Sequence, residues 1–404
     1  MNKIKVITFG SSLHSQKEQL QLKERFFSEI ESAGDLSIEE VRAPSVEGVV
    51  AVVVLTGGVE REALKLISLL PSPVLLIAYS GHNALPASLE ILARIRQDGG
   101  EGRILFGSPQ EIATGLCREL RVTSAWEALR FARVGLIGDP SDWLVASNVE
   151  PAFLKGRMGI DLVRIEIDEL LEKISSVSPS RKEISQLVKQ TRKVREPSKD
   201  ELRGAVAIYA GLRVLVEEHR LTACSIRCFD LIASLRNTAC YALSRLNSEH
   251  IPAGCEGDLQ ALFSLYLGYL ISEASAFMGN ISLIDSAHRR ITLAHCACPL
   301  SLASSCILRS HFESGLGVGI AAHIPEGPCT LFRLGGARLN KLFVREGRIQ
   351  NAPVREDLCR TQVTVSISEP IDQLLRTPLG NHHILILGHH REVIEGLFDR
   401  FLRA

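Results

Sequence analysis

Short apolar runs alternate with longer amphipathic stretches through the first third of the chain. The run 48–55 is almost continuously β-branched, and three other apolar runs accompany it, at 3–10, 74–78 and 103–106. Such a run is typical of a strand that is buried on both faces of a parallel sheet. Because helical stretches separate the runs, we predict a doubly wound α/β domain over residues 1–130.

A second domain of the same kind is predicted over residues 131–275. Apolar runs at 134–137 and 225–229 have the length of strands. Ser198 and Glu201 have the spacing of a capping box, which predicts that a helix begins there. Apolar residues then recur with a helical period, as in a helix that packs one face against a core: Leu202, Ala205, Val206, Tyr209, Leu212 and Val216. Asp230 is expected to cap a further helix.

The pattern changes after Phe277. Short apolar runs follow one another, separated by turns that contain glycine or proline, and no long helical stretch intervenes before residues 391–402: 290–296, 317–322, 330–334, 341–345, 362–367 and 383–387. Successive short strands of this kind predict an antiparallel structure. We therefore expect residues 276–404 to form a β-barrel-like domain that ends in a helix.

Charge and composition narrow the classes of function. Lysine plus arginine and aspartate plus glutamate each number 46, so the formal charge is zero and no basic field attracts nucleic acid or an anionic membrane. The apolar stretch 262–279 is broken by Glu273, which argues against a membrane span. The chain starts with a strand-like segment and has ten scattered cysteines. These features predict a cytoplasmic protein with reduced thiols and no cysteine-based zinc site.

Glu256 is the carboxylate that the pattern marks most clearly. An apolar run ends in Cys255-Glu256-Gly257-Asp258, and Asp258 is placed to cap a helix that begins at Leu259. In open α/β sheets the ligand cleft lies at the carboxyl ends of the strands, and a helix N-terminus there favours an ionised carboxylate. We therefore expect a functional role for Glu256.

His82 and Asn83 follow the predicted strand 74–78 in the first domain. This position places them at the ligand edge of the first sheet, where they are candidates for substrate binding. A purely turn-forming role explains the two residues equally well.

Several segments resemble the L-fucose/L-arabinose isomerase superfamily, and the resemblance covers most of the chain. Its more specific motifs are Cys255-Glu256-Gly257-Asp258 and Gly380-Asn381-His382; the segments 80–86, 134–143, 277–280 and 294–296 support them. The chain looks more similar to the fucose-isomerase-like branch than to either named sugar isomerase. Two α/β units followed by a β-rich end agree with the resemblance.

The resemblance implies a reaction and a set of residues. Members of the superfamily interconvert an aldose and a ketose through an enediol with a divalent metal, typically manganese. A carboxylate must then remove a proton beside a carbonyl group while a cation holds the oxyanion. By resemblance, Glu256 is a metal ligand and the proton-transfer group, and His382 is a second ligand. His295 falls where the arabinose enzymes have another histidine ligand, and it is expected either to bind the metal or to contact the substrate.

The superfamily's second acidic ligand falls at Asn280 in this chain. A neutral amide offers a carbonyl oxygen but no charge, so the metal is expected to bind weakly. Asp285, a few residues further on, is a candidate to replace it. The asparagine also motivates an alternative, a non-catalytic sugar-binding or regulatory protein. Retro-aldol cleavage, which uses the same metal–enediolate chemistry, is a third hypothesis.

Assembly is a further implication of the resemblance. Members of the superfamily form trimers or hexamers in which the N-terminal domain of a neighbour completes each site. We therefore expect a homotrimer or homohexamer that binds a small sugar or sugar derivative, with His82 and Asn83 donated across the interface. No nucleic acid and no membrane is expected as a partner.

Overall fold

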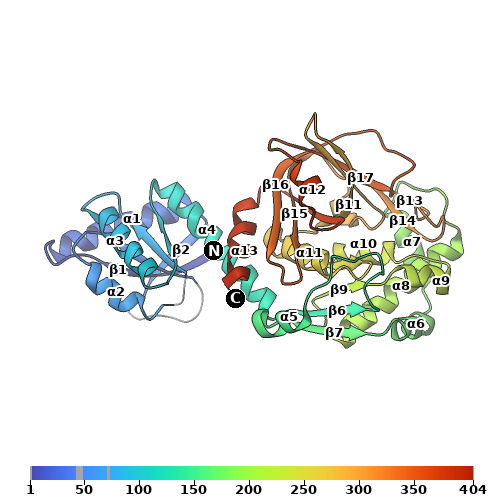
Figure 1. Ribbon diagram of the computed structural model, residues 1–404, viewed down its shortest axis with the longest axis horizontal. Coiled ribbons are helices and arrows are strands. Elements are labelled where there is room, and N and C mark those ends of the chain that lie inside the picture. The colour runs from blue at the N-terminus through green and yellow to red at the C-terminus, as the bar shows by residue number, and fades with distance from the viewer. Residues whose placement is uncertain (1, 42–48, 71–72, 404) are drawn as a thin grey trace. The chain divides into compact units, whose positions relative to one another are not determined.

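A computed structural model describes residues 2–41, 49–70 and 73–403, which belong to two compact units, 1–124 and 125–404 (Figure 1). The start of the predicted strand 48–55, at Gly48, lies outside the described residues. Among the described residues, we find no helix that combines the length and the apolar character needed to cross a membrane. The division into three domains at residues 130 and 275 stays a prediction.

The first unit is built on a five-stranded parallel sheet with the order β2-β1-β3-β4-β5. Its strands are β1 (Asn2–Phe9), β2 (Leu36–Glu40), β3 (Val50–Val54), β4 (Val74–Ala78) and β5 (Gly102–Leu105). The connecting helices are α1 (Gln16–Ala33), α2 (Glu60–Ile67), α3 (Ala84–Gln97) and α4 (Pro109–Arg130). Two separate apolar clusters use alternate residues of the central strands. Burial on both faces explains the β-branched run in β3, and the predicted parallel α/β architecture is confirmed.

The edge strand β2 was not expected from the sequence. Leu36 is its only buried residue, so it lacks the continuous apolar run of the central strands. Its backbone pairs with β1 in a parallel register from Leu36 to Glu40. An edge position with one buried side chain leaves little trace in the hydrophobic pattern.

The second unit contains a four-stranded parallel sheet with the order β10-β9-β6-β7. Its strands are β6 (Arg133–Ile137), β7 (Asp161–Ile165), β9 (Ala223–Ile226) and β10 (Ala253–Cys255). Its helices are α5 (Pro151–Met158), α6 (Ile167–Ser176), α7 (Arg181–Lys189), α8 (Lys199–Glu218), α9 (Phe229–Leu235), α10 (Cys240–Ser248) and α11 (Leu259–Ser272). The predicted capping box at Ser198 and Glu201 starts α8. The prediction for Asp230 is wrong: α9 begins one residue earlier, and Asp230 bonds Arg227 instead of capping.

Six antiparallel strands then close into a barrel, as predicted for the C-terminal part. Their order is β11-β12-β17-β16-β15-β18. The strands are β11 (Phe277–Asp285), β12 (Arg290–His295), β15 (Gly327–Gly335), β16 (Lys341–Gln350), β17 (Thr361–Ile367) and β18 (His382–Leu387). The short helix α12 (Gln373–Arg376) lies between β17 and β18 in the chain, and α13 (Arg391–Arg403) follows β18. The expected strand at 317–322 forms β14 (Gly319–His323), which lies outside the barrel in a small sheet with β13 (Ser305–Arg309) and β8 (Lys193–Val194).

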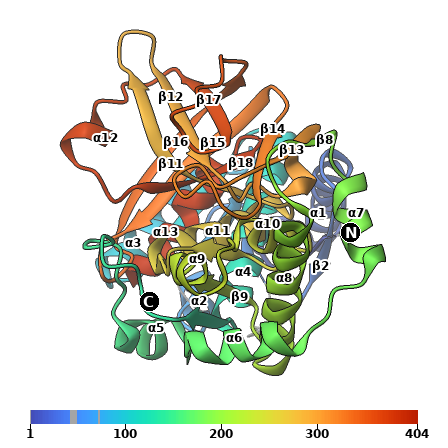
Figure 2. The ribbon, with the colours of Figure 1, turned by 90° about the vertical axis from the view of Figure 1, so that its right-hand side faces the viewer.

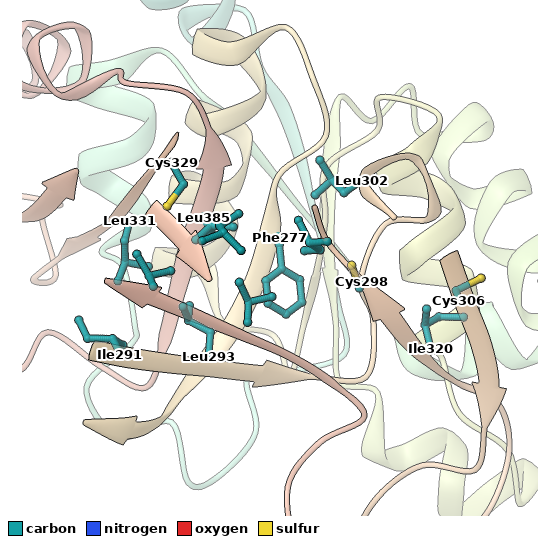
Figure 3. Close-up of a cluster of buried hydrophobic side chains, with 14 of the residues drawn as sticks. Phe277, Ile291, Leu293, Cys298, Leu302, Cys306, Ile320, Cys329, Leu331 and Leu385 are labelled. Carbon is teal, nitrogen blue, oxygen red and sulfur yellow. The ribbon is translucent and has the colours of Figure 1, made fainter. Parts of the chain in front are cut away.

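An apolar core fills the barrel and continues towards the small sheet. Phe277, Leu331 and Leu385 point into its centre, and Cys298 and Ile320 extend it on the side of β13 and β14 (Figure 3). The interior is therefore packed with side chains, which keeps the strand ends fixed relative to one another.

Helix α11 lies between the parallel sheet and the barrel within the second unit (Figure 2). Every residue from Leu259 to Gly268 is buried, because the helix contacts β9 and β10 on one side and β15 and β18 on the other. The buried Ser264 hydroxyl accepts a 2.9 Å hydrogen bond from the backbone N–H of Leu334 in the barrel. The loop that starts α11 is thereby held where strand ends of the sheet and of the barrel meet.

Candidate functional site

Glu256 occupies a constrained loop between β10 and α11. Its φ is +63°, and that of Gly257 is +71°, both in the left-handed region. A side chain at 257 would place its Cβ 2.7 Å from Cα of Pro140, so only glycine fits. Glu256 is not a glycine, so its left-handed backbone conformation is strained by about 1–3 kcal/mol. Backbone strain of this kind occurs at functional sites, and in this chain it also occurs at helix ends, as at Arg236 and Glu273.

The two carboxylate oxygens of Glu256 have different neighbours. Oε2 accepts a 2.7 Å hydrogen bond from Nε1 of Trp143. Oε1 lies 3.9 Å from Nε2 of His382, at the start of β18. The structure therefore brings together Glu256 and His382, which are 126 positions apart in the chain. The family resemblance had placed both residues in one site, whereas the hydrophobic pattern had not.

His382 is completely buried and is oriented by Asp258. Its Nδ1 lies 3.0 Å from Oδ2 of that aspartate. An ionised carboxylate only accepts hydrogen bonds, so Nδ1 carries a proton, and in the neutral form of the ring the lone pair is therefore on Nε2. Nε2 itself is buried without a hydrogen-bond partner, and it faces Glu256.

Asp258 does more than the capping that its sequence position predicted. It caps α11 by accepting a 2.8 Å bond from the backbone N–H of Ala261, as expected. Its carboxylate also pairs with the fully buried Arg333 of β15, at 3.3 Å. Burial alone would raise the pKa of Asp258, but Arg333, His382 and the Ala261 amide together lower it below its ordinary value. The carboxylate therefore stays charged inside the protein.

Arg333 ties the barrel to the loops that carry the site. Its guanidinium donates to Oγ of Ser147 at 2.9 Å and to the backbone oxygens of Leu379 (3.2 Å) and His382. A fully buried guanidinium is stable only when its donors are satisfied in this way. Sequence reasoning missed Arg333, Ser147 and Trp143, because nothing local to these residues shows which carboxylate or carbonyl each one meets.

Asn280 and His295 lie beside this pair on neighbouring barrel strands. Asn280 of β11 is directly opposite His382 of β18 in the antiparallel register. Its Oδ1 accepts a 3.0 Å bond from Nδ2 of Asn381. The ring of His295, at the end of β12, meets that of His382 edge to face at 5.5 Å.

The tautomer of His295 follows from its backbone neighbour. Nδ1 accepts a 3.2 Å bond from the N–H of Ala297, so in the neutral ring the proton is on Nε2. Burial, together with His382 and His311, lowers the pKa of His295 to about 3, which keeps the ring neutral. A ring nitrogen that carries a proton donates hydrogen bonds and does not bind a metal. The arrangement therefore favours substrate contact over metal binding for His295.

A small cavity of about 60 Å³ adjoins these groups. Its lining includes Glu256, Asn280 and His295. Pockets for whole small molecules are usually about 300–1,000 Å³, so this cavity has room only for an ion with water or for the reacting end of a ligand. Five cysteines that are scattered along the sequence also converge on it: Cys228, Cys240, Cys255, Cys296 and Cys359.

Glu256 and His382 are the two side chains of the site that could hold a divalent cation. Within the described parts of the chain, no three His, Cys, Asp or Glu side chains are arranged to hold a metal ion. Oε1 of Glu256 and Nε2 of His382 are 3.9 Å apart. Neighbouring ligand atoms of a cation with bonds of about 2.1 Å lie about 3.0–3.4 Å apart, so the two side chains would have to approach each other slightly to share one. After that approach the unpartnered Nε2 and the carboxylate fit an open site with two side-chain ligands, where water or substrate oxygens complete the coordination.

The remaining sequence candidates lie elsewhere. His82 and Asn83 follow β4 in the first unit with φ of +52° and +56°, and the His82 ring stacks on Tyr79 with centroids 6.0 Å apart. Their role in substrate binding stays a prediction. Asp285 does not replace the missing acidic ligand, because it lies five residues beyond Asn280 on β11, is exposed, and pairs with His288 at 2.7 Å. Five residues of strand span about 16 Å.

Comparison with known proteins adds a sequence relationship. No family model matches the chain. It is 25% identical over 352 residues to a sulfoquinovose isomerase of Clostridium sp. (strain MSTE9), covering 80% of this chain and 73% of that protein. The chain is also similar to two other sulfoquinovose isomerases. It is 22% identical over 293 residues to that of Alkalicoccus urumqiensis, covering 70% of this chain and 66% of that protein. It is 22% identical over 312 residues to that of Priestia aryabhattai, covering 73% of this chain and 68% of that protein. Across most of its length the chain is therefore similar to sugar isomerases.

Proposed function

We propose that this protein is a sugar isomerase that interconverts an aldose and a ketose through an enediol. The observation that carries the proposal is the approach of Glu256 Oε1 to the unpartnered Nε2 of His382, 3.9 Å apart beside a cavity. Similarity to sulfoquinovose isomerases supports the reaction class. The finer assignment to the fucose/arabinose isomerase type, as a cytoplasmic homotrimer or homohexamer, belongs to the same proposal.

The residues divide the chemistry between them. Glu256 removes the proton from the carbon beside the substrate carbonyl and returns it to the former carbonyl carbon, while the hydroxyl proton passes from one substrate oxygen to the other. His295 donates a hydrogen bond from its Nε2–H to a substrate oxygen and stays neutral throughout. Asp258 keeps the proton of His382 on Nδ1, so that Nε2 remains available as a ligand.

A divalent cation, which we propose to be manganese, would be held by Glu256 Oε1 and His382 Nε2, with Asn280 at its edge. When bound, it would stabilise the negative charge that develops on the substrate oxygens. Two side-chain ligands and a neutral amide supply only one negative charge, so we expect weak binding and a need for added metal.

A second candidate function is sugar binding without turnover. Asn280 favours it, because an amide stands where the resemblance places an acidic ligand. The two functions differ in whether a carbon-bound hydrogen exchanges with solvent. Binding without exchange supports the second function, and cleavage of the carbon chain would indicate the retro-aldol reaction.

The test is a panel of aldoses and ketoses, with sulfoquinovose included, incubated with the protein and Mn²⁺ in deuterated water. NMR detects both the isomer and the deuterium that an enediol route places on carbon. Glu256→Gln should abolish exchange while the protein stays folded. Glu273→Gln is a matched control, because Glu273 ends the same helix α11, also at positive φ (+53°), but is exposed. Absence of isomerisation and exchange across the panel would contradict the proposal.

A further inference from the structure

We infer that Trp143 is a positioning residue for Glu256. Its indole N–H fixes one oxygen of the carboxylate and so directs the other towards His382 and the cavity. The catalytic consequence rests on the proposed function, whereas the contact itself can be tested without it.

The hydrogen bond makes the two oxygens of Glu256 inequivalent. A free glutamate carboxylate rotates about its last side-chain bond with little preference, so either oxygen can face a given neighbour. The 2.7 Å bond from Trp143 Nε1 removes that freedom by holding Oε2. An indole nitrogen only donates, so it stabilises the charged carboxylate and cannot take up the proton that Glu256 must carry.

Trp143 is itself held in place by the loop that follows β6. Its ring meets that of Phe229 edge to face, with centroids 5.0 Å apart. The adjacent Asp142 pairs with Arg227 at 3.2 Å, and the Arg227 guanidinium also donates to the backbone oxygen of Pro140 at 2.8 Å. The indole is therefore supported by a ring contact and by the anchored loop beside it.

The loops that carry the two residues are joined by their backbones as well. The N–H of Ser141 donates a 2.8 Å bond to the carbonyl oxygen of Glu256. Gly257 packs against Pro140 so closely that a Cβ would collide with it. The loop after β6 and the loop after β10 thus form one unit, and the indole keeps its position relative to the carboxylate.

Exposure argues that Trp143 is not placed there to fill a core. The residue is 53% exposed, although its N–H is committed to Glu256. A large aromatic side chain that is half exposed removes less apolar surface from water than the same side chain would in a core, so its burial stabilises the fold less. Its hydrogen bond to the candidate base gives a specific reason for this residue at this position.

The first experiment compares turnover. Trp143→Phe keeps an aromatic ring against Phe229 but removes the N–H. We expect kcat to fall about tenfold or more, as for the loss of a hydrogen bond to a charged group, with KM changed less than about twofold. Trp143→His, which keeps a ring N–H, should recover part of the loss. Unchanged kcat in Trp143→Phe would overturn the inference while leaving the proposed function in place.

The second experiment needs neither metal nor turnover. The chain has two tryptophans, so the indole N–H resonances of the ¹⁵N-labelled protein can be assigned with Trp126→Phe. The Trp143 resonance should move in Glu256→Ala and stay in place in Glu273→Gln. If it stays in place in both variants, the contact is absent and the inference fails. If it moves while no sugar reacts in the wild type, the contact stands and the proposed function fails.

Discussion

His382 Nδ1 and Asp258 Oδ2 are 3.0 Å apart, and both side chains are fully buried. This contact gives the histidine its tautomer and places its free nitrogen opposite Glu256. Arg333 supplies the positive charge that keeps the aspartate ionised at this depth. One buried carboxylate therefore connects the start of α11, the barrel and the candidate site.

Asp258→Asn should be strongly destabilising. The substitution preserves size and can preserve the helix cap, but it leaves the buried Arg333 guanidinium without its counter-charge. Loss of one partner of a buried pair costs about 3–5 kcal/mol of unfolding free energy. Urea denaturation of the variant and the wild type measures this difference in unfolding free energy. Ser198→Ala, which removes the cap of α8 without exposing a buried charge, should cost only about 1 kcal/mol. Equal losses in the two variants would show that Asp258 acts only as a cap.

The metal-free protein should lose stability as the pH falls below about 6.5. The pKa of His295 is about 3 in the folded protein, against 6.5 for an ordinary histidine, because burial and the neighbouring His382 and His311 oppose its charge. Between these values the unfolded chain binds a proton that the folded chain does not. The unfolding free energy should therefore fall with decreasing pH, by up to about 1.4 kcal/mol per pH unit for this group.

His295→Asn, which does not titrate, should reduce this slope in denaturation measured between pH 7 and pH 4 in the presence of a chelator. His389→Asn replaces an exposed histidine and serves as the control. A slope unchanged in His295→Asn but reduced in His389→Asn would contradict the assignment.

Asn280→Asp should tighten manganese binding. The residue faces His382 across the β11–β18 pair and lines the cavity, so a carboxylate there adds a negative ligand beside Glu256 and His382. We expect affinity to rise about tenfold or more, as the charge count of the ligands increases. Calorimetry with Mn²⁺ measures the change, and Asn351→Asp provides an exposed control. Equal affinity in Asn280→Asp and wild type would place the cation elsewhere.

Cys228 and Cys255 should form a disulfide under mild oxidation. Their sulfurs are 2.8 Å apart, and both thiols line the cavity beside Glu256. The hydrogen bond with Cys228 and burial raise the pKa of Cys255 well above its ordinary value, so the reaction should be slow at neutral pH and faster at alkaline pH. Diamide as oxidant and mass spectrometry of tryptic peptides provide the measurement. Cys228→Ser should abolish the product, and a different pairing in the wild type would contradict the prediction.

The sequence by itself determined the architecture and many of the elements. Continuous apolar runs marked β3 and β4, a capping box marked the start of α8, and successive short runs marked the barrel strands. These features depend on the backbone preferences and burial of residues that are near one another in the chain. Local patterns record such effects directly.

Only the tertiary structure decided which distant groups meet. The partners of Glu256 and Asp258 lie 113 and 75 positions away, at Trp143 and Arg333, and no period or motif encodes either pairing. The small sheet of β8, β13 and β14 joins strands from separate regions and was likewise not foreseen. A hydrophobic pattern reports whether a residue is buried, but a buried polar residue is stabilised by a particular partner. That partner is fixed by how the sheet, α11 and the barrel pack together.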